Sequence, residues 1–155
     1  MDLSTLLFSF QGRANRAKYW LAVLIYFVTA IILALFGFVT SHTLGLGLIY
    51  GIVGTIVYIG MLVSGVAVGI KRLHDRAKSG WWLLVFYVLP TVIVLIGTFL
   101  SWGAGSMIIS GLFSLIALAI SVWGFVELGC LRGSVGPNGY GPDPLMDGMV
   151  QRPAE

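Results

Sequence analysis

The charged residues of this chain are confined to three short stretches, which long apolar runs separate. No Asp, Glu, Lys or Arg occurs from Tyr19 to Ile70, nor from Ser79 to Val126. The nine lysines and arginines lie before the first apolar run, between the second and third, and after the fourth. Cations in alternate gaps mark the cytoplasmic side of multi-span membrane proteins, so this pattern predicts both a membrane location and an orientation.

The composition points the same way. Hydrophobic residues make up 58% of the 155 residues and charged residues 10%, whereas soluble domains have roughly 45–50% and about 25%. A soluble chain of this length has too little interior to bury so much apolar surface, but the hydrocarbon of a bilayer accommodates it. The single cysteine, Cys130, excludes an intrachain disulfide.

The apolar runs predict an all-α integral membrane protein with four transmembrane helices. The predicted spans cover residues 19–40, 44–70, 81–101 and 107–129. Each reaches the length of about 20 residues that crosses a bilayer, and the second is long enough to tilt or to continue beyond the hydrocarbon. We expect a single membrane domain over residues 1–144 and a flexible tail over residues 145–155.

The gaps between the spans fix the predicted threading. Residues 41–43 and 102–106 carry no charge, whereas the N-terminal segment, the loop 71–80 and the C-terminal tail carry every lysine and arginine. The positive-inside rule therefore places both termini and the loop in the cytoplasm. The first apolar run exceeds the length of a signal-peptide core, so we interpret it as the first transmembrane helix.

Small residues recur along the second span at four-residue spacing. The pairs are Gly47/Gly51, Gly60/Ser64 and Gly65/Gly69. Such pairs let helix backbones approach closely in lipid, and we favour packing within the four-helix unit over an oligomer contact. In the third span, Pro90 is expected to kink the helix or to end its first half.

Few ionisable residues border the spans. If the second helix continues into the loop, Arg72 and Asp75 lie three residues apart and close enough to pair. Glu127 is the only acid within or bordering a span, and such a residue is a functional hypothesis by default. We expect an ion pair with Arg72 or Arg13, in preference to a role in proton transfer.

The tail over residues 133–144 contains Pro-Asn-Gly and Gly-Pro-Asp-Pro, which are turn-forming sequences. We therefore expect an ordered loop that folds against the cytoplasmic face. Asn138 and Asp143 would offer hydrogen bonds within it.

Three segments together resemble a known family. Residues 10–20 (FQGRANRAKYW), residues 71–82 (KRLHDRAKSGWW) and residues 136–144 (GPNGYGPDP) are similar to the opening, central and closing motifs of the bacterial inner-membrane family called domain of unknown function 805. The resemblance covers residues 8–144, nearly the whole chain. The departures from the family pattern are Arg76, Ala77 and Gly139.

The resemblance implies a small multi-span protein of the bacterial inner membrane, and it supplies no established activity. It also implies that the three motifs belong together. Because the predicted threading puts all three on the cytoplasmic side, we expect them to form one polar cap over the helices.

The leading functional hypothesis is a non-enzymatic protein whose cytoplasmic face binds an anionic group, such as a phospholipid headgroup, or a partner protein. Clustered arginines beside interfacial tryptophans suit phosphate recognition. The candidate binding residues are Arg13, Arg16, Arg72, His74, Asp75, Lys78, Glu127, Asn138 and Asp143. Membrane lipids are the expected partners, homo-oligomerisation is a further option, and no nucleic acid, cofactor or metal is expected.

Two other functions stay open. A small oligomeric channel or transporter could line a pore with hydroxyl side chains, namely Thr29, Thr55, Ser64, Thr91, Ser110, Ser114 and Ser121. A membrane enzyme could use His74, Asp75 and Glu127. The enzyme hypothesis is weakest, because the sequence shows no recognisable nucleophile or metal-ligand spacing.

Overall fold

The computed structural model describes residues 2–40 and 44–146, and it confirms the all-α architecture. No strand occurs among these residues. In chain order the helices are α1 (Leu3–Phe8), α2 (Arg16–Thr40), α3 (Leu44–Asp75), the π-helix η1 (Leu84–Val88), α4 (Leu89–Ala104), α5 (Met107–Phe125) and the π-helix η2 (Val126–Cys130). Most of the predicted flexible tail lies outside the described residues.

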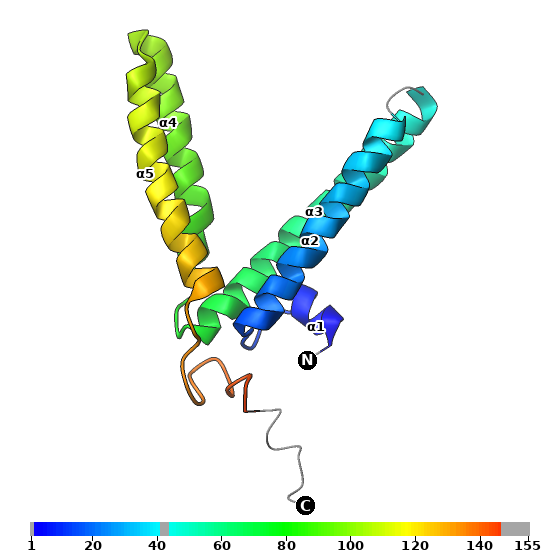
Figure 1. Cartoon of the computed structure of the whole chain (residues 1–155), viewed down its shortest axis with the longest axis vertical. Helices are drawn as coiled ribbons and strands as arrows, with labels where there is room; N and C mark the ends of the chain where they lie inside the picture. Colours follow the sequence, from blue (N-terminus) through cyan, green and yellow to red (C-terminus); the bar gives the residue numbers. More distant parts are fainter. Residues whose placement is uncertain (1, 41–43, 147–155) are drawn as a thin grey trace, which may run out of the picture.

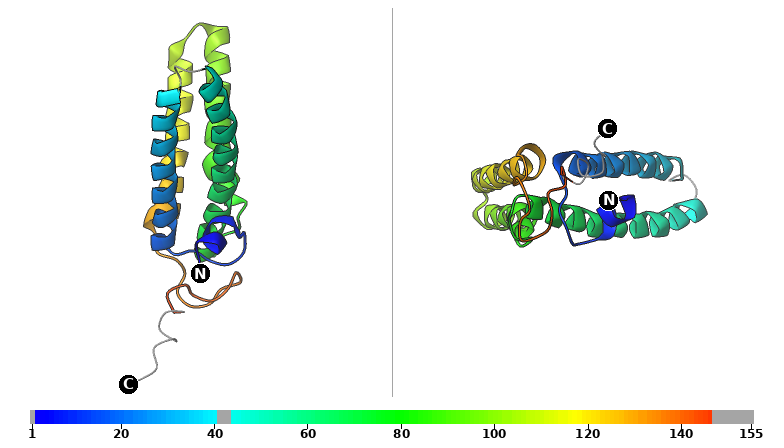
Figure 2. Two further views of the ribbon diagram at one scale, coloured as in Figure 1. Left: turned by 90° about the vertical axis from the view of Figure 1, so that its right-hand side faces the viewer. Right: turned by 90° about the horizontal axis from the view of Figure 1, so that it is seen from below.

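The helices form a V with two arms (Figure 1). Helices α2 and α3 pair as one arm, and α4 and α5 pair as the other. The arms meet at the end that carries both chain termini, and side views show that the V is flat (Figure 2). At the junction Trp20 of α2 packs edge-on against Phe125, the last residue of α5, with ring centroids 5.9 Å apart. Beyond that end, the described backbones of the two arms do not approach each other.

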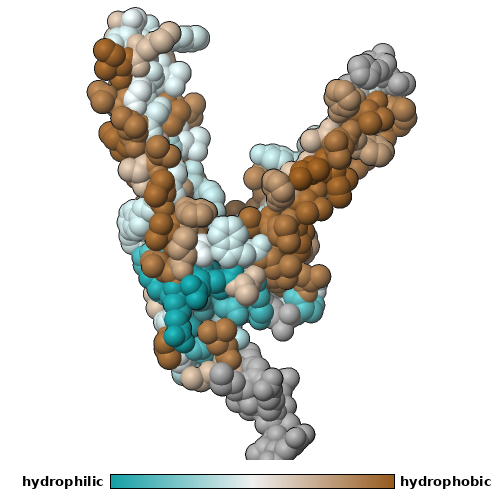
Figure 3. All heavy atoms as spheres, viewed as in Figure 1, coloured by the Kyte–Doolittle hydropathy of each residue, from teal (hydrophilic) through white to brown (hydrophobic). Residues whose placement is uncertain are grey.

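Four helical segments are long and apolar enough to cross a membrane, which confirms the four predicted spans. They are Arg16–Thr40, Gly45–Asp75, Leu84–Ala104 and Met107–Cys130. As predicted for the second span, α3 continues beyond its apolar run and ends at Asp75. On the face drawn in Figure 3, side chains of high or intermediate hydropathy cover both arms and hydrophilic ones gather at the junction, so lipid would surround the arms.

The disturbance predicted at Pro90 takes the form of a π-helical turn. Pro90 is buried in the first turn of α4, directly after η1. A proline has no N–H to donate, and its ring clashes with the carbonyl four residues earlier, here Phe86. The wider turn of η1 accommodates both effects and lets the helix continue.

The close-packing glycines are mostly not those that the sequence predicted. A Cβ built on Gly51, Gly60 or Gly65 would meet nothing within 4 Å, so the prediction of packing within the unit is wrong at these positions. The reason is that the arms diverge beside α3. Only Gly69 is tightly packed, because a Cβ there would lie 2.8 Å from Leu83.

Glycines instead close the second arm and its base. A Cβ on Gly97 of α4 would lie 2.4 Å from Cβ of Phe113 in α5, and one on Gly124 would lie 2.9 Å from Phe86. A small core of Leu73, Leu83, Phe86 and Leu128 joins the two arms at the junction. The buried apolar contacts of the V are therefore concentrated at one end.

The contact at Gly97 yields a first prediction. Gly97→Ala should lower the free energy of unfolding by about 1–3 kcal/mol, because the added methyl group overpacks the α4–α5 interface. Gly111→Ala in α5 is the matched control, since its Cβ would meet no atom within 4 Å. Thermal unfolding in detergent measures both, and equal stability of the two variants would contradict the packing.

Candidate functional site

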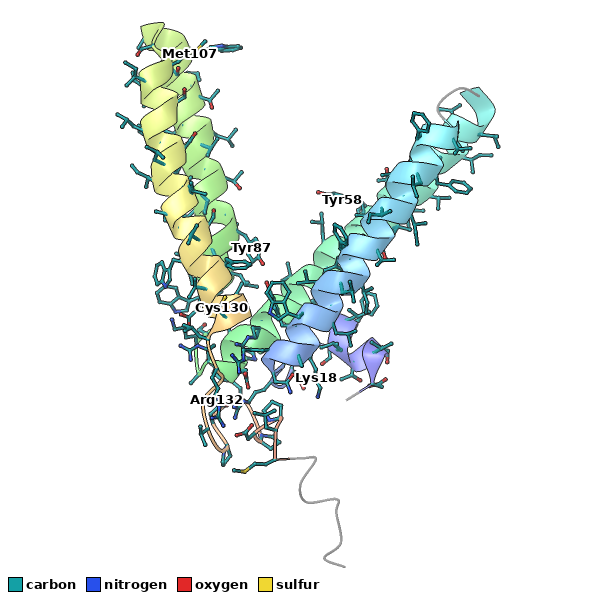
Figure 4. All side chains as sticks on the ribbon, in the orientation of Figure 1. Lys18, Tyr58, Tyr87, Met107, Cys130 and Arg132 are labelled. Carbon is teal, nitrogen blue, oxygen red and sulfur yellow. The ribbon has the colours of Figure 1, made fainter. Side chains whose placement is uncertain are left out.

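The three sequence motifs converge at the junction of the V (Figure 4). We call this assembly, formed by residues 11–18, 71–80 and 127–146, the polar cap. Hydrogen bonds join its segments: the backbone N–H of Ala14 donates to the carbonyl of Lys71 at 3.1 Å. Just beyond the first segment, the indole N–H of Trp20 donates to the carbonyl of Gly129 at 3.0 Å. The predicted assembly of the motifs is thus present in the structure.

At the centre of the polar cap, one carboxylate lies between two arginines. Oδ1 of Asp75 accepts from Nε and Nη2 of Arg13 at 3.2 and 3.1 Å. Oδ2 accepts from Nη1 of Arg72 at 2.5 Å, which is the pairing that the three-residue spacing predicted. All three residues are buried, and Arg72 has no exposed surface. A buried charge is tolerable only when it is paired and hydrogen-bonded, and Asp75 meets both conditions.

The remaining donors of Arg13 organise the C-terminal loop. Its Nη1 donates to the carbonyl of Gly136 at 2.7 Å and to that of Gly141 at 3.3 Å, and its Nη2 donates to the carbonyl of Ser134 at 2.6 Å. Three carbonyls of one loop thus converge on a single guanidinium. The planar fork of arginine suits this arrangement, which the point charge of lysine could not reproduce.

Arg72 makes the corresponding contacts with the end of the second arm. Its Nε donates to the carbonyl of Leu128 at 2.7 Å, and its Nη2 donates to that of Leu131. These carbonyls lie at the π-helical end of the last span, where the helix leaves acceptors without internal partners. Arg72 therefore ties α3 to the end of the second arm through these two carbonyls, whereas its pair with Asp75 lies within α3.

Glu127 pairs with residues other than those predicted. Its Oε1 lies 3.0 Å from Nε of Arg76 and 3.0 Å from Nζ of Lys78. The expectation of Arg72 or Arg13 as partner is wrong, because Asp75 already occupies both of those guanidinium groups. An ion pair at Glu127 is nevertheless present.

His74 and Asn138 fasten the C-terminal loop to α3. The ring of His74 stacks on Tyr140 with centroids 3.9 Å apart and planes 6° from parallel, and its Nδ1 lies 3.2 Å from the carbonyl of Gly12. Nδ2 of Asn138 donates to the backbone carbonyl of His74 at 2.9 Å. His74 thus bonds to the N-terminal segment, while the neighbouring Asp75 binds arginines.

Asp143 closes the same loop. Its carboxylate accepts from the N–H of Gly136 at 2.9 Å and from the N–H of Leu145 at 3.0 Å. The N–H of Leu145, followed by that of Gly136, lowers the pKa of Asp143 because both stabilise the charged form. The predicted hydrogen-bonding role of this residue is internal to the loop.

Sequence reasoning missed the role of Lys71. This lysine has no exposed surface, and its Nζ donates to the carbonyls of Thr5 at 2.6 Å and of Leu6 at 2.5 Å. These carbonyls belong to the last turn of α1, so Lys71 docks the N-terminal helix against α3. The position of Lys71 directly at the end of a long apolar span was the available signal.

The family can now be assigned. The model of the family described as protein of unknown function (DUF805) matches residues 7–142. The chain belongs to the DUF805 family. No solved structure matches it.

Curated relatives in this family are similar over most of their length. The chain is 29% identical to the inner membrane protein YhaH of Escherichia coli K12, over 89% of this chain and 88% of the relative. It is 31% identical to the inner membrane protein YhaI of the same strain, over 87% and 85%, and 28% identical to the uncharacterized protein YiiR, over 92% and 90%. The protein is therefore an integral membrane protein of the inner-membrane type.

One pocket of this DUF805 protein opens at the edge of the polar cap. It has a volume of about 380 Å³. Its lining residues are Asn15, Arg16, Ala17, Asp75, Arg132, Gly133, Ser134, Asp143 and Leu145. We call it the arginine pocket, because Arg16 and Arg132 bring two guanidinium groups to one cavity from opposite ends of the sequence.

The charges around the arginine pocket favour an anion. Arg16 and Arg132 are exposed, and no described carboxylate lies within salt-bridge distance of either. Nη1 of Arg16 donates to the carbonyl of Cys130 at 3.1 Å, and its other side-chain donors have no partner among the described residues. Of the two acids in the wall, Asp75 is paired with Arg13 and Arg72, whereas Asp143 keeps its charge and interacts electrostatically with Arg132. Because the arginines around the pocket outnumber these two carboxylates, the pocket has a net positive charge.

The start of α2 adds to this field. Oδ1 of Asn15 accepts from the N–H of Lys18 at 3.0 Å and so caps the helix. The N–H groups of Arg16 and Ala17 have no acceptor among the described residues. Helix N-termini favour anions.

Sequence reasoning missed Asn15, Arg132 and Ser134 as pocket residues, because only the fold brings them together.

The structure thus separates the nine predicted binding residues into two groups. Arg16 lines the arginine pocket with a largely free side chain, and Asp143 and Asp75 line it with occupied carboxylates. The other six are engaged in internal bonds of the polar cap. Within the described part of the chain, no three His, Cys, Asp or Glu residues could hold a metal ion.

Gly133 supplies a test of the central carboxylate. A Cβ on Gly133 would lie 2.0 Å from Oδ2 of Asp75, so Gly133→Ala must displace the carboxylate from its arginines. The expected loss is about 3–5 kcal/mol in the free energy of unfolding, the scale of a broken buried ion pair. Gly139→Ala in the same loop is the matched control, because its Cβ would meet nothing within 4 Å. Denaturant titration in detergent compares them, and a loss in both variants would reject the assignment.

The lowered pKa of Asp143 predicts how the loop responds to pH. Because the folded loop favours the charged carboxylate, its stabilisation is complete above the ordinary pKa of about 3.9 and is lost as the pH falls through the lowered value. Asp143→Asn should therefore speed amide hydrogen exchange at Gly136 and Leu145 at neutral pH. The amide of Ala22 in α2 should be unaffected, and unchanged exchange at both loop positions would contradict the prediction.

Proposed function

We propose that the arginine pocket binds the anionic headgroup of a membrane phospholipid, in a non-catalytic role. The single observation that carries this proposal is the meeting of two exposed guanidinium groups, Arg16 and Arg132, without a carboxylate partner at one cavity. Arginine engages phosphate through two parallel hydrogen bonds. Asn15 and Ser134 line the same cavity and offer further polar contacts.

The position of the pocket supports a lipid as the source of the anion. Arg16 is the first residue of α2, which is long enough to span the membrane. The pocket therefore lies level with the headgroups at the basic end of the protein. The positive-inside rule assigns that end to the cytoplasm, where anionic lipids are concentrated.

The internal bonds of the polar cap refine the predicted ligand set. Arg13 and Arg72 would have to leave Asp75, Gly136 and Leu128 to reach a ligand. Breaking such a buried pair costs about 3–5 kcal/mol, which exceeds what a weakly held headgroup would return. We therefore assign these two arginines to holding the pocket walls, and Arg16 and Arg132 to binding.

No observation favours the channel or transporter. Several of the hydroxyls that could line a pore donate to carbonyls of their own helix. They are Thr55 to Gly51, Thr91 to Tyr87, Ser110 to Met107 and Ser121 to Ala117. Each of these hydroxyls donates its single O–H to its own helix, so it has no donor left for a solute in a pore.

Removing the two arginines tests the proposal. Native mass spectrometry of the detergent-solubilised protein would compare binding of phosphatidylglycerol and phosphatidylcholine with identical acyl chains. Arg16→Gln and Arg132→Gln should each reduce the preference for phosphatidylglycerol by about tenfold or more, since each loses charge-assisted hydrogen bonds.

Lys18→Gln is the matched control, because it removes the same charge near the start of α2 without lining the pocket. Equal losses in all three variants would indicate diffuse attraction and contradict the proposal. Competition by inorganic phosphate at millimolar concentration would show that the site recognises free phosphate, and retention of a protein in place of lipid would identify a partner-protein surface.

A further inference from the structure

A second and larger cavity lies between the arms where they begin to diverge. It has a volume of about 770 Å³. One wall comes from α2 and α3, including Tyr19, Tyr26 and Gly65, and the other from the start of the second arm, including Leu84, Tyr87 and Val88. We call it the inter-arm cleft. Its lining differs from that of the arginine pocket. Most of its residues belong to the membrane-spanning segments, whereas Ser79, Gly80 and Trp81 belong to the loop before η1.

Away from the loop, the inter-arm cleft faces the space between the arms that lipid would fill. Its walls consist mainly of aliphatic and aromatic side chains, and side chains of intermediate to high hydropathy cover the arms beyond it (Figure 3). Tyr87 and Leu84 in η1 are 56% and 48% exposed. An occupant must therefore be largely apolar and must enter from the membrane.

Two phenol groups in the cleft restrict the occupant further. Tyr19 and Tyr87 line the cleft from its two walls, near enough for their side chains to interact, and neither hydroxyl makes a hydrogen bond with any other described residue. Two facing hydroxyls carry two O–H donors, but the pair can satisfy at most one of them. The other O–H is left without an acceptor at membrane depth, where an unsatisfied donor is costly. The occupant should therefore present an oxygen acceptor.

Such an acceptor distinguishes a lipid from a second copy of this chain. The carbonyls of a transmembrane helix already accept internal hydrogen bonds and lie behind the side chains of that helix, so they are poorly accessible to a hydroxyl of another molecule. An ester-linked acyl chain has a carbonyl at its polar end. Tyr19 is three residues from the first residue of α2, close to the interface where aromatic side chains and ester groups lie.

We propose that the inter-arm cleft holds one acyl chain of an ester-linked glycerophospholipid, and that its ester carbonyl accepts a hydrogen bond from the Tyr19–Tyr87 pair. The proposal is independent of the arginine pocket, because lipids of any headgroup charge carry the ester. A zwitterionic lipid therefore tests the cleft without testing the headgroup site.

Photo-crosslinking locates the acyl chain. Purified full-length protein would be reconstituted with phosphatidylcholine that carries a diazirine on one acyl chain, and the labelled residues would be mapped by mass spectrometry. Labels should concentrate on cleft residues such as Tyr26, Gly65 and Tyr87. Uniform labelling of all lipid-facing helix surfaces, or cross-links between two copies through the cleft, would overturn the proposal.

A cleft-filling variant provides a matched comparison. Gly65 lines the cleft, and a Cβ there would meet nothing within 4 Å, so Gly65→Leu can fill the cleft without an internal clash. It should reduce cleft labelling by at least about fivefold, the scale of some ten lost atom contacts. Gly51→Leu lies on the same helix in equally open space outside the cleft and should leave labelling unchanged. Equal effects of the two variants would overturn the proposal.

The hydroxyl pair has its own readout. Native mass spectrometry should show that the protein retains ester-linked phosphatidylcholine about fivefold better than the ether-linked analogue, the scale of one hydrogen bond. The double variant Tyr19→Phe/Tyr87→Phe should remove this preference, whereas Tyr58→Phe, an exposed tyrosine outside the cleft, should retain it. A wild-type protein without the preference would overturn the assigned hydrogen bond.

Discussion

Asp75 lies between the guanidinium groups of Arg13 and Arg72, and its carboxylate joins parts of the chain that are far apart in sequence. Through the carbonyls that these arginines also bind, the N-terminal segment, the end of α3, η2 and the C-terminal loop share one buried network. A buried ion pair stabilises a fold only when its remaining donors are satisfied. Here backbone carbonyls satisfy them, so the polar cap can be dry and rigid at the end of a membrane protein.

The V shape follows from where the contacts are concentrated. The apolar core of Leu73, Leu83, Phe86 and Leu128 lies at the junction, beside the ion network. Farther along the arms no contact between them opposes divergence, because lipid is as apolar as the helix surfaces and solvates them equally well. The open glycines of α3 are consistent with this, since they face the space between or around the arms and pack against no described neighbour. The inter-arm cleft is a consequence of the same geometry.

Function depends on which polar groups remain after the fold has used the others. Every arginine near the spans looks equally suited to bind an anion when only its type and position are known. The structure commits Arg13 and Arg72 to Asp75, and Arg76 to Glu127, and it leaves Arg16 and Arg132 at a shared pocket. Likewise Tyr19 and Tyr87 matter because they line the inter-arm cleft from both arms. Both proposed sites therefore use side chains that internal bonding has left available.

The sequence by itself determined the four spans, the grouping of three motifs at one end and the Arg72–Asp75 pair. These features depend on hydropathy, charge distribution and a three-residue helical spacing, all of which are local along the chain. Only the tertiary structure decided that Glu127 pairs with Arg76 and Lys78, that Lys71 docks α1, and that α3 glycines stay open. Those outcomes result from competition among several donors for few acceptors and from the angle between the arms. The competition and the angle both depend on how far apart the segments lie in space, which their separation along the chain does not determine.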